Sequence, residues 1–222
     1  MVKPISKENN FAYLTTILVF LLFASAVVEE FAGHLGQRIV QISTILTLVV
    51  GIWSLKSNYS WFHSKMGTAI ALVIILIINI ILDLMGLDFL QLFILLGFFI
   101  FTTYFAARQV LFSGIIDGNK IIGSICIYLL MGLIWCILYL IILEFEPNAF
   151  NGLSAASWYQ NFPEVTYFSY VTLTTLGYGD ISPILPIARF FVFMEAIVGV
   201  FYMAILVASL IGVRMSEHNK HH

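Results

Sequence analysis

Residues 161–183 read NFPEVTYFSYVTLTTLGYGDISP and lie between the last two long apolar runs of the chain. The part 162–174 predicts a helix, with Asn161 as its N-cap and Pro163 in its first turn. Such a helix is only about 20 Å long, too short to cross a hydrocarbon core of about 30 Å. A Gly-x-Gly turn follows it, which is the pattern of a segment that enters a membrane and returns as extended backbone.

The turn itself, Thr-Leu-Gly-Tyr-Gly at 175–179, suits the binding of a dehydrated cation. Irregular backbone at membrane depth is tolerated where it lines a watery path, and successive carbonyls aimed at one axis can replace an ion's water shell. Aiming them the same way requires left-handed backbone at alternate residues, which Gly177 and Gly179 reach without a Cβ clash. We expect Thr175 to add a hydroxyl at the inner end. We expect Tyr178 to point away from the axis and brace the strand.

The composition indicates a membrane protein. Hydrophobic residues make up 61% of the 222 residues and charged residues 10%, whereas globular proteins carry about 45–50% and about 25%. Six apolar runs are long enough to cross a bilayer as helices. They are Phe11–Val28, Ile39–Leu55, Gly67–Met85, Leu87–Phe105, Ile121–Leu143 and Leu185–Val213. The third and fourth are separated only near Gly86, which predicts a tight helical hairpin.

The basic residues predict the orientation of the chain. With a cytoplasmic N-terminus, eight of the ten basic residues fall on the inner side: Lys3, Lys7, Lys56, Lys65, Arg108, Lys120, Arg214 and Lys220. Only Arg38 and Arg189 fall outside, so the positive-inside rule is satisfied. An even number of helices also places the C-terminus inside. We therefore expect a multi-pass protein of the plasma or inner membrane with both termini cytoplasmic.

At residues 175–179 the chain resembles pore-loop potassium channels, whose filters read Thr-Val-Gly-Tyr-Gly, and in particular six-helix members of prokaryotic type. The resemblance covers about 121–213. It implies an all-α fold of six transmembrane helices, with a re-entrant pore helix and extended filter between the fifth and sixth. One filter per chain implies a homotetramer. The resemblance assigns the potassium filter to Thr175, Leu176, Gly177, Tyr178 and Gly179, and filter support to Tyr167, Phe168, Thr172 and Asp180.

Three positions depart from this pattern. Leu176 replaces the usual β-branched residue and loses stiffness at χ1. Phe168 stands where many relatives carry a hydrogen-bonding tryptophan, and Val171 where some carry a glutamate. We expect fewer partners behind the filter and a filter that collapses more readily at low potassium.

The sixth apolar run contains the candidate gate. Glu195 is the carboxylate well inside this predicted span, and we expect it to hydrogen-bond near the base of the pore helix, with a protonated carboxyl group as one alternative. Its role is either structural or one of pH sensing or gating. Gly199 falls at the usual inner-helix hinge position, and the alternative is that it allows close helix packing. One stripe of the helix, which the resemblance places toward the cavity, consists of Val200, Met203, Val207 and Ile211. These residues could close the path by dewetting or could simply pack against other helices.

Other functions fit less well. The fourth run contains no arginine, Arg108 lies beyond it, and several gating charges are needed for steep voltage dependence, so we expect weak or no voltage gating. No pairing of His, Asp, Glu or Cys has metal-ligand spacing and no nucleophile has a nearby base, which argues against an enzyme. A transporter subunit with a related filter is the closer alternative, but such chains usually carry several degenerate pore segments.

The predicted organisation is a four-helix transmembrane domain at 1–120, a pore domain at 121–215 and a short cytoplasmic tail at 216–222. Potassium ions are the expected ligands, without an organic cofactor. The expected partners are further copies of the chain and membrane lipid, without nucleic acid and without a soluble ligand-binding domain. The sequence leaves open the gating stimulus and whether helices one to four contact their own pore domain or a neighbour's.

Overall fold

The computed structural model describes residues 10–30, 43–44, 46–47, 49–51, 88–111, 118–154 and 156–218. The described part is mostly helical. Its helices are α1 (Asn10–Glu30), α4 (Asp88–Leu111), α5 (Gly118–Phe145), α6 (Trp158–Leu173) and α7 (Pro186–His218). Two short strands, β1 (Phe150–Asn151) and β2 (Ser182–Pro183), were not predicted from the sequence.

Three helices in this part of the chain are long and apolar enough to cross a membrane: Phe89–Val110, Gly118–Phe145 and Pro186–Ser209. A shorter apolar stretch, Phe11–Val27, lies in α1. The chain is therefore a mostly helical membrane protein. The predicted span Ile39–Leu55 lies largely outside the described residues, and the span Gly67–Met85 with its hairpin at Gly86 lies wholly outside them.

The helices extend beyond the apolar windows that predicted them. Helix α4 continues past Phe105 to Leu111, so Arg108 lies in its last turn and not beyond the helix. Helix α7 continues past Val213 to His218. Hydropathy marks only the residues that favour lipid, whereas the backbone hydrogen-bond ladder continues into polar sequence.

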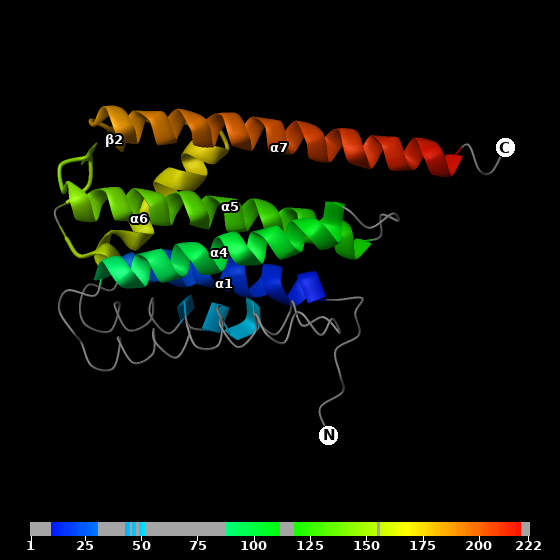
Figure 1. Ribbon diagram of the computed structural model, residues 1–222, viewed down its shortest axis with the longest axis horizontal. Helices are drawn as coiled ribbons and strands as arrows, with labels where there is room; N and C mark the ends of the chain where they lie inside the picture. Colours follow the sequence, from blue (N-terminus) through cyan, green and yellow to red (C-terminus); the bar gives the residue numbers. More distant parts are fainter. Residues whose placement is uncertain are drawn as a thin grey trace, which may run out of the picture.

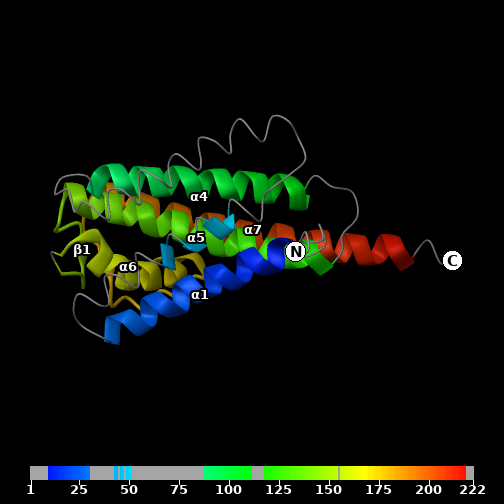
Figure 2. The ribbon, with the colours of Figure 1, turned by 90° about the horizontal axis from the view of Figure 1, so that it is seen from below.

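Helix α5 is at the centre of the arrangement. Helices α1 and α4 both pack against it, on different sides, and α6 crosses α5 and reaches α7 (Figures 1 and 2). Six residues separate the end of α4 from the start of α5, and so short a connection favours antiparallel neighbours. Both N-terminal helices, α1 and α4, contact α5 of their own chain.

The core of the molecule forms where these helices meet. Its largest fully buried aliphatic side chains come from three helices: Leu14, Leu18 and Leu21 of α1, Leu92 and Leu95 of α4, and Leu130, Leu133, Ile137 and Leu140 of α5. In a bilayer such contacts stabilise the fold through close packing, because lipid tails are as apolar as leucine.

Helix α6, the expected pore helix, begins earlier than predicted. Ser157 is the N-cap, and its N–H and Oγ donate to Oε1 of Gln160 at 3.3 and 2.9 Å, as in a capping box. The prediction of Asn161 as the cap is wrong, since this residue lies within the helix. Its side-chain amide donates to the carbonyls of Ser154 and Ala156, which precede the helix, both at 3.2 Å.

Pro163 also lies inside α6 and not in its first turn. It lacks an N–H, so it cannot make the intrahelical hydrogen bond expected at that place. The helix continues because its C-terminal half is buried against α5 and α7.

The two strands tie the ends of the pore segment together. They pair antiparallel, Phe150 with Pro183 and Asn151 with Ser182, so the loop after α5 holds the segment that precedes α7. Helix α7 then begins at Pro186, a favoured first helical residue, and projects beyond the ends of the other helices (Figure 1).

Candidate functional site

The turn after α6 has a regular alternation of backbone hand. Thr175, Gly177 and Gly179 have φ angles of +60°, +58° and +83°. The two glycines adopt the positive φ that their lack of a Cβ allows. Thr175 does so as well, although a β-branched residue is disfavoured there, at a cost of about 1–3 kcal/mol that the surrounding structure must offset. Residue type gave no sign of this.

The carbonyl of Val171 holds the first part of the turn. It accepts hydrogen bonds from the N–H of Leu176 at 2.9 Å and from the N–H of Gly177 at 3.4 Å. In a trans peptide the C=O points opposite to the N–H, and the described residues contain no cis peptide bond. The carbonyls of Thr175 and Leu176 therefore both point away from the pore helix, in the same direction.

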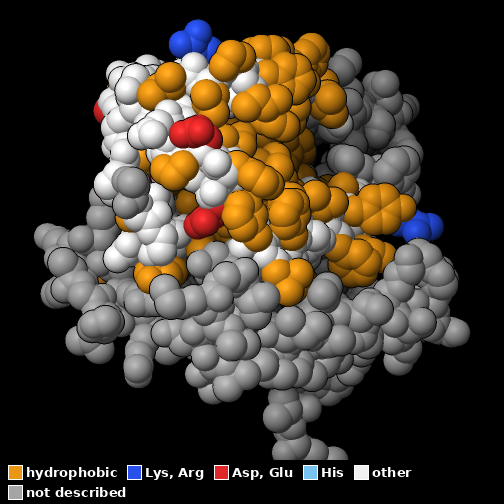
Figure 3. Space-filling view, turned by 60° about the vertical axis from the view of Figure 1, so that its left-hand side comes forward, with side chains coloured by type: hydrophobic (Ala, Val, Ile, Leu, Met, Phe, Trp, Pro, Cys, Tyr) orange, Lys and Arg blue, Asp and Glu red, His pale blue; other side chains and the backbone are white. Residues whose placement is uncertain are grey.

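Side chains of the turn are uncovered in the single chain. Every residue from 174 to 180 is exposed, and the exposed fractions reach 59% for Leu176 and 68% for Tyr178. Figure 3 shows a broad hydrophobic surface on the face that it presents, interrupted by few charged side chains. Exposed apolar area of this extent marks a surface that contacts lipid or another protein chain.

The outer end of the turn is fixed by a hydrogen bond. The hydroxyl of Tyr167 donates to Oδ2 of Asp180 at 2.8 Å. This hydrogen bond stabilises the carboxylate and lowers the pKa of Asp180 below its usual value. Behind it, Gly152 has a φ of +84°, and a Cβ there would lie 2.4 Å from the carbonyl oxygen of Asp180.

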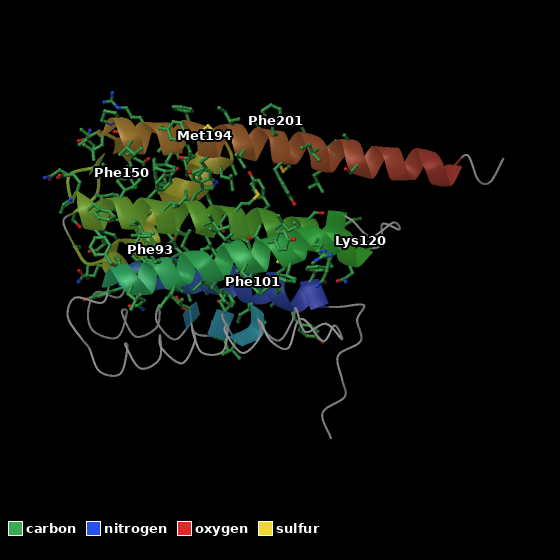
Figure 4. The ribbon with its side chains drawn as sticks, viewed as in Figure 1. Phe93, Phe101, Lys120, Phe150, Met194 and Phe201 are labelled. Atoms are coloured by element: carbon green, nitrogen blue, oxygen red, sulfur yellow. The ribbon has the colours of Figure 1, made fainter. Side chains whose placement is uncertain are left out.

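The other two predicted support residues lie on the buried side of α6. Phe168 packs against Tyr139 and Phe150, with ring centroids 5.3 and 5.6 Å apart, and so fills the space between α5 and β1. Figure 4 shows Phe150 in this interior position. Thr172 is buried, and its carbonyl accepts the N–H of Thr175 at 2.9 Å.

Glu195 lies fully buried between three helices. Its Oε1 lies 2.6 Å from Oγ of Ser169 on α6, and its Oε2 accepts a hydrogen bond from the hydroxyl of Tyr139 on α5. The sequence indicated a contact with the pore helix, but neither Ser169 nor Tyr139 was identified as a partner. Their only sequence signal was polarity within otherwise apolar helices.

Gly199 lies against the C-terminal end of the pore helix. A Cβ at this position would be 2.2 Å from the carbonyl oxygen of Leu173, which is closer than real Cβ contacts. The same carbonyl accepts a hydrogen bond from the hydroxyl of Tyr128 at 3.2 Å. The geometry therefore favours close packing over a hinge as the reason for glycine here.

The predicted cavity stripe is exposed in the single chain. The exposed fractions are 55% for Val200, 45% for Met203 and 49% for Val207. The side chain of Ile211 lies outside the described residues. Phe201, at 64%, lies on the side of α7 that faces away from α5 (Figure 4). Helix α7 thus has apolar side chains without cover on more than one face.

Residues 124–215 match a family model, Ion_trans_2, described as an ion channel. This part of the chain is similar to ion-channel domains. The match confirms the resemblance to pore-loop channels for the segment that contains α6, the turn and α7. No curated protein and no solved structure is detectably similar to the chain.

Residues 174–181, between α6 and β2, form neither helix nor strand. Within the described residues no group of three or more His, Cys, Asp or Glu side chains is placed to hold a metal ion. Backbone carbonyls and the hydroxyl of Thr175 are oxygens that this turn can offer to a cation.

Proposed function

We propose that the chain is a subunit of a homotetrameric, potassium-selective channel, with residues 175–179 as its filter. The observation that carries the proposal is the direction of the carbonyls of Thr175 and Leu176. Both point away from the pore helix because Val171 accepts the two following amides. A potassium ion needs several such oxygens around it, and one chain offers only one side of the shell.

The exposure of the filter supports assembly. Leu176 and Tyr178 are more than half exposed, and the apolar side chains of α7 lack cover in the single chain. Four copies around one axis would surround the ion with carbonyls and cover these side chains at the same time. The partial negative charge at the C-terminal end of each α6 would favour a cation below the filter.

Weak voltage dependence is part of the proposal. Helix α4 contains a single basic residue, Arg108, in its last turn. One elementary charge gains about 2.3 kcal/mol per 100 mV, and several are needed for steep opening. We place the N- and C-termini on the cytoplasmic side of the cell membrane, because that side then receives most of the basic residues.

The test is flux into liposomes that contain the purified protein, with K⁺ or Na⁺ as the only permeant cation. We expect flux with K⁺ and little with Na⁺. Gly177→Ala should abolish the preference for K⁺, because a φ of +58° costs an alanine about 1–2 kcal/mol and the backbone of the turn should change. A steric clash within the chain would not be the cause, since no atom of the same chain lies within 4 Å of the new Cβ.

Gly97→Ala is the matched control. It adds the same methyl group to α4 at a position where nothing lies within 4 Å, and it should conduct as the unmodified protein does. Equal flux of the two cations would refute the selectivity. An assembly of fewer than four 25.0 kDa chains, measured by light scattering on a conducting preparation, would refute the tetramer.

A further inference from the structure

A series of hydrogen-bonding groups connects α5, α6 and α7 at the point where these three helices meet. Ser169 Oγ lies 2.8 Å from the carbonyl oxygen of Gly132 and 2.6 Å from Oε1 of Glu195. The hydroxyl of Tyr139 donates to Oε2 of the same carboxyl group. Ser169 and Glu195 have no exposed surface, so bulk water does not reach these contacts.

The number of available hydrogens decides the protonation of Glu195. A serine hydroxyl has one hydrogen, and a backbone carbonyl can only accept. If Ser169 donated to Glu195, its oxygen and the carbonyl of Gly132 would face each other at 2.8 Å as two acceptors. If Ser169 donates to Gly132, the 2.6 Å contact needs its hydrogen from Glu195. Only the second arrangement places a hydrogen in every contact.

We propose that Glu195 is a neutral carboxylic acid that donates to Ser169 and thereby positions the pore helix against α7. The hydrogen-bonded chain runs from Tyr139 to Glu195, from Glu195 to Ser169, and from Ser169 to Gly132. It joins all three helices of the ion-channel domain. Glu195 is a positioning residue, since it acts on the filter through α6.

The surroundings of Glu195 agree with a neutral group. The titratable side chains that face it are Tyr128, Cys136 and Tyr139 from α5 and Tyr170 from α6. None of them is a cation. A buried carboxylate without a cationic partner costs several kcal/mol, and a low-polarity membrane interior increases that cost.

The position of the chain gives it a role in conduction, which rests on the proposed function. Ser169 lies one helical turn before Leu173, the last residue of α6, and Glu195 lies one turn before Gly199, which contacts the carbonyl of Leu173. Helix α7 is therefore joined to the base of the filter at two successive turns. Removal of the proton from Glu195 at alkaline pH should loosen this joint and lower K⁺ flux.

Infrared difference spectroscopy tests the protonation directly. The spectrum of the unmodified protein in lipid at neutral pH, minus that of Glu195→Gln, should contain the C=O stretching band of a protonated carboxylic acid. Glutamine reproduces both contacts, with its N–H donating to Ser169 and its carbonyl accepting from Tyr139. The control is Glu146→Gln, at an exposed position after α5, which should give no such band.

Ser169→Ala provides a second arm. It removes the acceptor of the acid proton, so the band should persist but change frequency. An absent band, or a band that Ser169→Ala leaves unmoved, would overturn the proposal. So would the failure of Glu195→Gln to assemble, because the protein would then need the negative charge.

Flux separates this inference from the proposed function. Glu195→Gln should keep the K⁺ flux at neutral pH and lose the decline of flux at alkaline pH. A decline that is unchanged in Glu195→Gln would refute the role of the joint. Absence of K⁺ selectivity in the unmodified protein would refute the channel proposal and leave the infrared result standing.

Discussion

Gly199→Ala tests whether α7 and the pore helix need direct contact between their backbones. The new Cβ would lie 2.2 Å from the carbonyl oxygen of Leu173, about 1 Å closer than the C···O distance of roughly 3.3 Å seen in close contacts. It would also lie 3.1 Å from Cδ1 of the same leucine. The carbonyl belongs to the end of α6 and cannot rotate away, so one helix must shift.

Overpacking of this kind costs about 1–3 kcal/mol, while alanine recovers up to about 1 kcal/mol of helix propensity over glycine. We expect the free energy of unfolding to fall by at most about 2 kcal/mol. For a chain of this size that corresponds to a melting temperature lower by roughly 4–8 °C. Because Leu173 lies two residues before the proposed filter, the preference for K⁺ over Na⁺ should also fall.

The assay is thermal unfolding of the purified protein in detergent, followed by circular dichroism, together with liposome flux. Gly97→Ala is again the matched variant, because its methyl group meets no atom within 4 Å and it should be neutral or slightly stabilising. If Gly199→Ala melts together with Gly97→Ala and keeps full selectivity, the close-packing role of Gly199 is wrong and a hinge becomes the better explanation.

Three further predictions concern the outer end of the turn at Asp180, the exposed stripe of α7 and the response of α4 to voltage. Tyr167→Phe removes the hydrogen bond that lowers the pKa of Asp180. A carboxylate whose pKa is lowered in the folded protein stabilises the fold fully above the ordinary carboxyl pKa of about 4. That stabilisation is lost as the pH falls through the lowered pKa. External acid should therefore reduce K⁺ flux at a higher pH in Tyr167→Phe, and superimposable pH profiles would contradict this. Val207→Asp should increase leak current through closed channels if the exposed stripe of α7 forms a dewetted gate, and unchanged closure in bilayer recordings would show that it does not. Arg108→Gln should leave the conductance–voltage relation almost unchanged, and the loss of a steep dependence would show that α4 carries a sensor.

The backbone conformation of the turn was predictable in part, because some of its requirements are local. Left-handed backbone at Gly177 and Gly179 follows from residue type, and a helix too short to span followed from the length of the apolar run. The positive φ of Thr175 was not predictable from its own side chain. It accompanies two hydrogen bonds in which the carbonyl of Val171 accepts from the N–H groups of Leu176 and Gly177, so that the chain turns directly after Thr175.

The start of the pore helix shows how local signals can mislead. Asn161 and Pro163 are both favoured near helix N-termini, yet both lie within α6. Ser157 and Gln160 supply a cap one turn earlier, and burial of the C-terminal half of α6 makes up for the hydrogen bond that proline lacks. Helix ends depend on which of several adequate caps the surrounding packing selects.

The amino-acid sequence alone indicated that the chain lies in a membrane, where its described apolar helices run, and that Gly177 and Gly179 adopt left-handed backbone, because hydropathy and backbone preference belong to each residue and its neighbours. Only the tertiary structure decided the partners of Glu195 and the reason for Gly199. Tyr139 and Ser169 are 56 and 26 residues away from Glu195 along the chain. Contacts over such separations arise from how the helices pack, and nothing in the local sequence specifies which side chains then meet.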